Sequence, residues 1–311
     1  MYIIELQYIK SLIILIWLKF YNLSKFIQSN IFRMETFYFG RLNLMKGLYS
    51  KEKNITDLLN HGFILKKLNI NYGIFNVELI KHDELGNIIT GKLVKYQDNK
   101  KENVIVKDSI ISQLNVPGVI LGNCEFYLLE KTHLIAYNPY GRIISSESFC
   151  KNFTEIILLG NDSMLIDSQI HPVVEEFKFL EFLRSMKVLK KFTVSLVPSN
   201  PNNRDLWKAM DERLRNMNVS KYKETLEADK NEGLKIDKLT ESKIHMAEDG
   251  YGKATGEGVS KDGTDITIST NEKESIIKKK IEQVATPDEK ISSLKLVFDK
   301  INERFTKENT K

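Results

Sequence analysis

The sequence predicts an α+β protein: a sheet-rich N-terminal domain followed by a mixed α+β C-terminal domain that ends in an amphipathic helix. Three observations predict this class. Apolar residues recur mainly at a period of two between residues 34 and 138, which is the period of strands. Helical spacing is frequent after residue 145. Of the 311 residues, 42% are hydrophobic and 28% are charged, a composition typical of a globular protein with a core.

The first 33 residues differ in composition from the rest of the chain. They contain 21 hydrophobic residues and no Gly, Pro or Ala, and they carry +3 of the total net charge of +5. Their longest uncharged stretch, 11–18, is shorter than the roughly 20 apolar residues that a membrane-spanning helix needs. Three interpretations of residues 1–33 stay open: a membrane-contacting amphipathic helix, a buried helix, or upstream sequence read in frame, with translation starting at Met34.

Several segments of the domain expected over residues 34–162 alternate apolar and polar residues, as half-buried strands do: 36–44, 75–79, 88–96, 124–129 and 133–137. A turn at 83–87 and a second turn at 130–132 each lie between two of these segments, so they predict two β-hairpins. The alternation places Phe75, Val77 and Leu79 on one face of a strand.

Gly160-Asn161-Asp162 breaks the pattern and marks the boundary to the second domain, residues 163–311. Helical periodicity is found in four segments: 145–158, 175–187, 202–217 and 220–229. Strand patterns are found in three others: 191–197, 251–259 and 265–270. The last two of these flank a turn and predict a hairpin.

The final helix has the clearest start signal in the chain. Thr286-Pro287-Asp288-Glu289 is a capping box with proline at the first helical position. The helix that follows carries an apolar stripe with a 3-4-3-4 spacing: Ile291, Leu294, Phe298, Ile301 and Phe305. This stripe predicts packing on its own domain or, alternatively, a homodimer interface.

One predicted helix carries a basic stripe. On a helical wheel of residues 202–217, Arg204, Lys208 and Arg215 lie opposite the apolar face, with Asp211 beside them. An exposed basic stripe is what a protein uses to neutralise nucleic-acid phosphates, so these three residues are the candidate nucleic-acid-binding site. The alternative is a solvated helix face on which Asp211 pairs with its basic neighbours.

The sequence offers no catalytic or metal-binding motif, and we predict no catalytic residues, no metal site and no cofactor. The five histidines are scattered, and Cys124 and Cys150 suit free thiols in a reducing compartment. Cys124 lies in a strand pattern and is predicted to be a core residue. The glycines of residues 250–258 lack a dinucleotide-binding spacing and predict a bent hairpin or close backbone approach instead.

The order of elements in the second half supports a resemblance. Strand Phe192–Val197, the Pro201-Asn202-Asn203 entry, helix Leu206–Met217 and the glycine hairpin Tyr251–Thr270 follow a sheet-rich part, and this layout resembles an uncharacterised bacterial domain family. More distantly, the layout over residues 35–285 is similar to RexA- and KwaB-type phage exclusion and antiviral defence proteins. The resemblance implies a cytoplasmic, dimeric defence protein that contacts DNA and acts with a small membrane partner protein.

The leading hypothesis is therefore a non-catalytic antiviral defence or phage exclusion protein that binds nucleic acid through Arg204, Lys208 and Arg215. A rival is a metal-dependent nuclease or toxin effector with an acidic cluster near Glu125 and Glu130. A third hypothesis is a protein-interaction module. The net charge of +2 over residues 34–311 requires that any attraction for nucleic acid be local.

Overall fold

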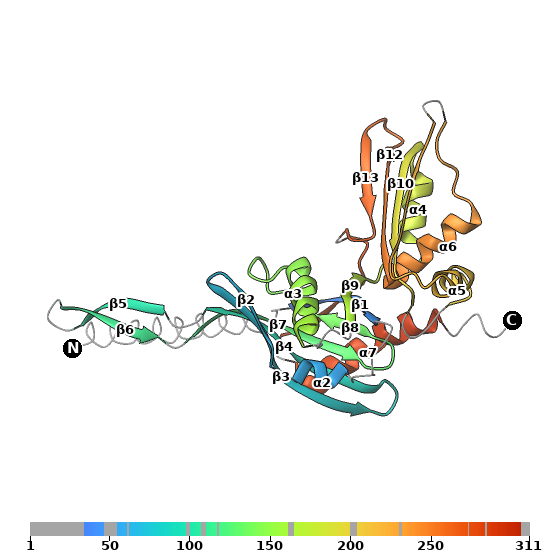
Figure 1. Cartoon of the computed structure of the whole chain (residues 1–311). Coiled ribbons are helices and arrows are strands. Elements are labelled where there is room, and N and C mark those ends of the chain that lie inside the picture. The colour runs from blue at the N-terminus through green and yellow to red at the C-terminus, as the bar shows by residue number, and fades with distance from the viewer. Residues whose placement is uncertain are drawn as a thin grey trace, which may run out of the picture.

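The structure is a computed structural model that describes residues 34–46, 55–60, 62–97, 100–106, 110–116, 118–160, 165–199, 204–229, 232–272, 274–283 and 285–305. Residues 1–33, about which three interpretations are open, lie outside the described residues. Figure 1 shows a large sheet, a smaller sheet that stands upright on it, and a projecting hairpin. The predicted α+β class is confirmed.

The large sheet is antiparallel throughout, as the hairpin signals predict. Its strands are β1 (Met34–Lys46), β2 (Ile64–Lys67), β3 (Ile70–His82), β4 (Gly86–Gln97), β7 (Val119–Leu129), β8 (Leu134–Tyr137), β9 (Leu165–Pro172) and β14 (Lys278–Glu282). They follow the order β14-β1-β8-β7-β4-β3-β2, and β9 also pairs with β1. β1 is the organising strand, because β14 pairs with its first half and β9 with its second half along one edge, while β8 pairs along the other.

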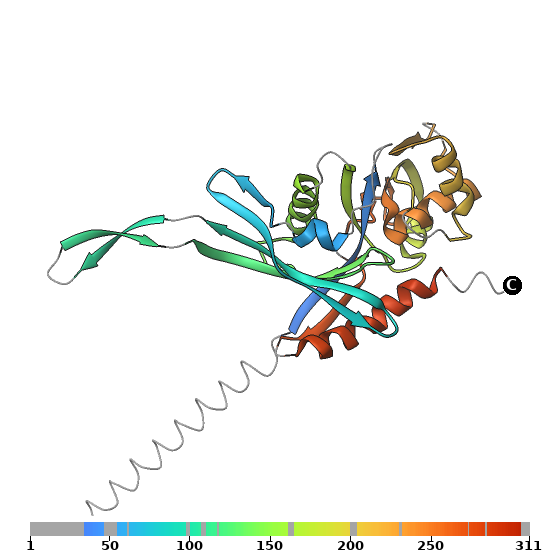
Figure 2. The same ribbon diagram turned by 60° about the horizontal axis from the view of Figure 1, so that its bottom comes forward.

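Helices cover both faces of this sheet. α2 (Ile55–Asn60) and α3 (Ser146–Leu159) pack on one face, and α7 (Pro287–Glu303) packs on the other (Figure 2). The predicted capping box at Thr286 and Glu289 is confirmed, with both reciprocal hydrogen bonds formed. Of the predicted apolar stripe, four side chains are buried against the chain's own sheet: Ile291, Leu294, Phe298 and Ile301. The stripe therefore stabilises the domain that carries it.

The upright unit is a four-stranded antiparallel sheet with helices on one face. Its strands are β10 (Val188–Leu196), β11 (Tyr222–Glu227), β12 (Gly252–Val259) and β13 (Asp265–Ser269), in the order β11-β10-β12-β13. α4 (Lys178–Ser185), α5 (Lys208–Asn216) and α6 (Lys238–Met246) cover its inner face. The close backbone approach predicted for the glycines is confirmed: a Cβ on Gly252 would lie 2.1 Å from the backbone oxygen of Ser195, and one on Gly258 would lie 2.2 Å from that of Val188.

A two-stranded hairpin extends the large sheet away from the body. β5 (Lys100–Val106) continues the line of β4, and β6 (Ile110–Val116) leads back into β7 (Figures 1 and 2). None of the described elements outside this hairpin pairs with it. None of the helices in the described ranges is long and apolar enough to span a membrane.

The division between the two sheets differs from the predicted boundary near residue 162. β9, β14 and α7 all follow that position in the sequence, yet they pack with the large sheet. The upright unit is therefore an insertion between β9 and β14. Linear order alone could not indicate this, because β14 lies far along the chain from its partner β1.

Three local predictions are wrong. Residues 220–229 were expected to be helical but contain strand β11. The helix expected over 202–217 begins only at Lys208. Phe75 and Val77 do not share a face, because a bulge between Phe75 and Glu78 shifts the register: Phe75 is 41% exposed, whereas Val77 packs against the core beneath α2 and α3.

A buried carboxylate joins the two units. Asp249 lies in η1 (Ala247–Tyr251), a π-helical turn between α6 and β12, and is 1% exposed. Its Oδ1 accepts a hydrogen bond from Arg304 Nη1 at 3.1 Å, and its Oδ2 accepts one from Trp207 Nε1 at 2.9 Å. Arg204 Nη1 lies 3.5 Å from Oδ2, and Arg41 Nε donates to the backbone oxygen of Asp249 at 2.9 Å. We call these five residues the Asp249 cluster.

The neighbouring residues of the same turn strengthen the junction. Asn43 Nδ2 of β1 donates to the backbone oxygen of Gly250 at 2.9 Å. Glu248 Oε1 accepts from the backbone amides of Phe179 and Leu180, at 3.0 and 3.3 Å, and so caps the N-terminus of α4. A side chain must supply this cap from elsewhere, because the residue at the N-cap position, Phe177, forms no side-chain cap.

Asp249→Asn should destabilise the protein by about 3–5 kcal/mol, because it leaves buried arginines without their counter-charge. Urea denaturation followed by circular dichroism measures this difference. Asp205→Asn is the matched control: Asp205 is exposed, so its replacement should change the free energy of unfolding by less than about 0.5 kcal/mol. Equal denaturation midpoints for the two variants would contradict the role assigned to the cluster.

Candidate nucleic-acid interface

The structure does not bring the predicted basic stripe together on one exposed face. Arg204 lies before α5 and its side chain is 5% exposed, paired with Glu176 and Asp249. Lys208 is the first residue of α5 and is exposed. Arg215 is 48% exposed, but its Nε donates to Asp211 Oδ2 at 2.8 Å. Arg204 is not part of an exposed basic stripe with Lys208 and Arg215. It precedes the first residue of α5 and is followed by a turn, so the helical wheel does not describe its position.

The guanidinium of Arg215 has a structural partner beyond the carboxylate. Asp211 is fully buried and accepts hydrogen bonds from the backbone amide and the hydroxyl of Ser199, at 2.6 and 2.7 Å. Arg215 Nη2 also donates to the backbone oxygen and the Oγ of Ser199. This network fixes the end of the segment after β10, so α5 presents Lys208 and a tethered Arg215 rather than three free cations.

The outer face of the upright sheet is polar, and none of the described helices α4, α5 and α6 covers it. We call it the open face. Its side chains alternate with the buried ones of β10, whose burial changes at every residue along Phe192–Leu196. Strand pairing aligns a row of hydroxyl groups across all four strands: Thr225, Thr193, Thr255 and Ser269. Such a row offers hydrogen-bond donors and acceptors to solvent or to a ligand.

Three lysines occupy the end of the open face nearest β9, and we call them the basic end. Lys223 and Lys253 flank Ser195 from the two neighbouring strands. Lys221 precedes Tyr222, whose side chain packs on the inner core, so alternation places Lys221 on the same face as Lys223. All three are exposed, and none forms an ion pair with a residue in the described ranges.

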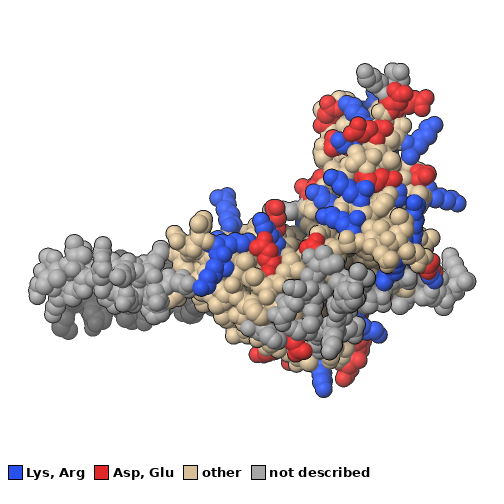
Figure 3. All heavy atoms as spheres, viewed as in Figure 1, with Lys and Arg blue, Asp and Glu red and all other residues tan. Residues whose placement is uncertain are grey.

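The opposite end of the open face is neutralised. Lys191 pairs with Glu227 at 2.9 Å, and the pKa of Lys191 is raised by that hydrogen bond and by the nearby carboxylate of Glu257. Lys190 pairs with Asp265 at 2.8 Å. In Figure 3, Lys and Arg side chains gather on the lower part of the upright unit and acidic side chains on its upper part. The face is therefore electropositive only toward the large sheet.

A pocket of about 520 Å³ lies where the open face meets the large sheet. We call it the corner pocket, and α3, β9, β12 and the segment after β13 line it: Ser146, Glu147, Cys150, Lys151, Thr154, Ser168, Gln169, Ile170, His171, Pro172, Lys253, Asn271 and Ile276. Ser168 is 4% exposed, and its Oγ forms no hydrogen bond with any described residue. Lys253 belongs both to this pocket and to the basic end.

A hydrogen-bond chain runs along β9 at the pocket. Gln169 Nε2 donates to Asp167 Oδ2 at 2.6 Å, and Gln169 Oε1 lies 2.9 Å from His171 Nε2. Because that amide oxygen can only accept, His171 Nε2 carries the ring proton and Nδ1 is left as an acceptor. Burial, with the charges of Lys221 and Lys253, lowers the pKa of His171 from 6.5 to about 4, despite the opposing effect of Asp167. The imidazole is therefore neutral at pH 7.

Both cysteines are free thiols, Cys124 buried and Cys150 half-buried. Cys124 is fully buried in the core beneath α3, as predicted, and Cys150 lines the corner pocket. Burial raises the pKa of each thiol to about 12. Neither cysteine is a thiolate at pH 7, so neither is suited to nucleophilic attack.

The carboxylates of the rival nuclease hypothesis have separate partners. Glu125 pairs with Lys290 of α7 at 2.6 Å, and Glu130 accepts a hydrogen bond from Asn87 Nδ2 at 2.7 Å. Within the described ranges, no group of three or more His, Cys, Asp or Glu side chains is arranged to hold a metal ion.

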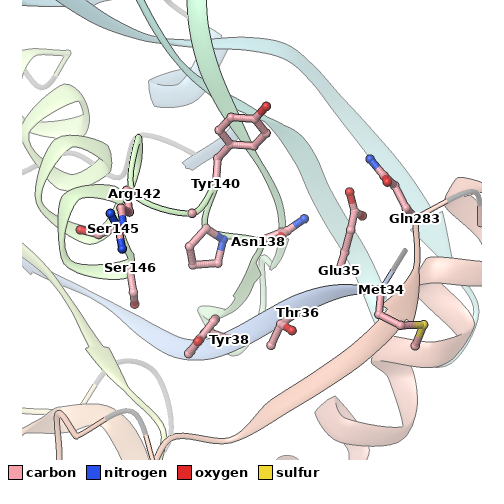
Figure 4. Close-up of a pocket in the computed structure, with 12 residues that line it drawn as sticks. Met34, Glu35, Thr36, Tyr38, Asn138, Tyr140, Arg142, Ser145, Ser146 and Gln283 are labelled. Atoms are coloured by element: carbon pink, nitrogen blue, oxygen red, sulfur yellow. The ribbon is translucent and has the colours of Figure 1, made fainter. Parts of the chain in front are cut away.

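A second cavity, of about 600 Å³, lies between the start of β1 and the loop that precedes α3. Figure 4 shows Arg142, Ser145 and Ser146 on one side of it and Glu35 and Gln283 on the other. It holds one basic and one acidic side chain, whereas the corner pocket has two lysines and one carboxylate. The corner pocket is therefore better suited to an anion.

The chain matches a protein-family model. A family described as a domain of unknown function (DUF4747) matches residues 36–295, a range that includes both sheets and most of α7. The prediction of an uncharacterised domain family is confirmed at that level. No curated protein matches the chain.

The neutral state of His171 makes stability depend on pH. Between pH 6.5 and about 4 the unfolded chain binds a proton at this residue and the folded chain does not, so acidification lowers the free energy of unfolding, by at most about 3 kcal/mol. His171→Gln should remove this part of the pH dependence, measured by urea denaturation at pH 7 and pH 4.5. His82→Gln, at the end of β3, is the control and should lose as much stability between pH 7 and pH 4.5 as wild type.

Proposed function

The chain belongs to the DUF4747 family, whose function is unknown, and we propose that it binds nucleic acid without cleaving it, through the open face of the upright sheet. The observation that carries this proposal is the basic end, in which Lys221, Lys223 and Lys253 lie together without carboxylate partners among the described residues. Lysine ammonium groups so placed attract phosphates and release their counterions.

The hydroxyl row next to the basic end supports the same ligand class. Side chains of Ser and Thr, together with Lys, are typical donors to phosphate and sugar oxygens of a nucleic-acid backbone. The open face offers them in register over four strands. A flat surface of hydroxyl groups does not distinguish one base sequence from another. The proposed binding therefore depends on the sugar-phosphate backbone of the nucleic acid and is strongly sensitive to salt.

Replacing Lys221, Lys223 and Lys253 together by Ala should weaken binding to DNA or RNA. Because three phosphate contacts would be lost, the slope of log affinity against log salt should flatten by about 2–3. Fluorescence anisotropy with labelled single and double strands, over a range of salt concentrations, measures both quantities.

The control removes positive charge from α5 instead of from the open face. Lys208→Ala with Arg213→Ala removes two exposed cations of that helix, one of them from the stripe predicted from the sequence. The double variant should keep the wild-type salt slope. If it flattens the slope and the triple variant does not, nucleic acid binds the α5 face and our assignment to the open face is wrong.

We further propose a role in antiviral defence or phage exclusion, supported by the resemblance in element order to RexA- and KwaB-type proteins. A homodimer and a small membrane partner protein belong to the same proposal. Expression in a susceptible bacterial host should lower the plating efficiency of phages, and the triple lysine variant should restore it. Unchanged plating efficiency across a broad phage panel would count against the defence role while leaving nucleic-acid binding intact.

A further inference from the structure

We propose that the corner pocket is a binding site for a single nucleotide, in the form of a nucleoside monophosphate. The site goes beyond the nucleic-acid face, because two of its walls, α3 and β9, belong to the large sheet and its helices. Its volume of about 520 Å³ lies within the range of roughly 300–1,000 Å³ that is usual for small-molecule sites.

Groups from three walls of the pocket are placed to bind the phosphate. Lys151 on α3 and Lys253 on β12 both line the pocket, and neither has an ion-pair partner among the described residues. Ser168 of β9 also lines the pocket, and its buried hydroxyl has no hydrogen-bond partner among the described residues. An unsatisfied buried hydroxyl is costly, so a ligand oxygen that accepts its proton restores the lost hydrogen bond.

The charge of the lining favours one phosphate over several. Two lysines and the carboxylate of Glu147 give the lining a formal charge of +1, and Lys221 adds a further positive charge near His171. A monophosphate, with a charge of at most −2, matches this set. A triphosphate would place additional negative charge close to Glu147.

The remainder of the lining suits a nucleoside. Ile170, Pro172 and Ile276 provide apolar surface for a base. His171 is neutral and keeps Nδ1 as an acceptor for a ribose hydroxyl or a base amino group, while the side-chain amide of Asn271 can both donate and accept.

Isothermal titration calorimetry of the full chain with each of the four ribonucleoside 5′-monophosphates tests the proposal. At least one should bind with a stoichiometry of one, and Ser168→Ala should weaken it about tenfold. The same variant should unfold at the same temperature as wild type or higher, because it removes an unsatisfied buried group; a purely structural serine would change stability but not affinity. Lys151→Ala should also weaken binding about tenfold, and Lys208→Ala should not.

Three results would overturn the proposal. One is the absence of binding by any nucleotide up to about 10 mM. Another is binding of inorganic phosphate as tight as that of the nucleotides, which would indicate an anion site only. The third is unchanged nucleotide affinity in both Ser168→Ala and Lys151→Ala. The nucleic-acid proposal fails separately, because Ser168 and Lys151 lie off the open face, and both variants should bind DNA and RNA as wild type does.

Discussion

The carboxylate of Asp249 is the constraint on which the arrangement of the molecule depends. It contacts Arg204, from the segment before α5, and Arg304, at the end of α7, while Arg41 of β1 donates to the backbone oxygen of the same residue. Each arginine has a further partner: Arg41 lies over the ring of Tyr251 at 4.7 Å, Arg204 pairs with Glu176, and Arg304 donates to the backbone oxygen of Val174. These contacts hold the two sheets at the angle that creates the corner pocket.

The sequence predicts the fold best where the signals are local. The capping box at Thr286 and the hairpin turns depend on neighbouring residues, and the structure has each of them. The sequence predicts the fold least well where strands that pair are far apart along the chain. β14 reads Lys-Lys-Lys-Ile-Glu, and only the pairing with β1, along Tyr38–Met34, makes it a strand. The insertion of one unit into the other follows from that pairing alone.

The sequence did not indicate the basic end for two reasons: the period of residues 221–227 was interpreted as helical, and the strand order was unknown. Residues 221–227 alternate between exposed Lys, Thr and Glu and partly buried Tyr, Glu and Leu, but the same segment also fits a helix, and the helical interpretation scatters its lysines. Correct alternation would have placed Lys221 and Lys223 on one face. Their meeting with Lys253 requires the strand order, which the sequence does not indicate. Arg204 was predicted to be exposed and to bind nucleic acid, but it is buried. Its burial depends on pairing with Asp249, which is distant in the sequence.

The closure of β1 by β14 has a consequence for how the protein is made. Arg41 and Asp249 are 208 residues apart in the sequence, and ribosomes add about 5–20 residues per second, so β1 waits about 10–40 s for its partner turn. During that time the edge of β1 that later receives β14 is unpaired and carries the apolar side chains of Phe37 and Phe39. Such an edge is prone to aggregation, so the nascent chain is a natural client for chaperones. When β14 emerges it pairs with this edge of β1, and α7 then covers the face of the sheet.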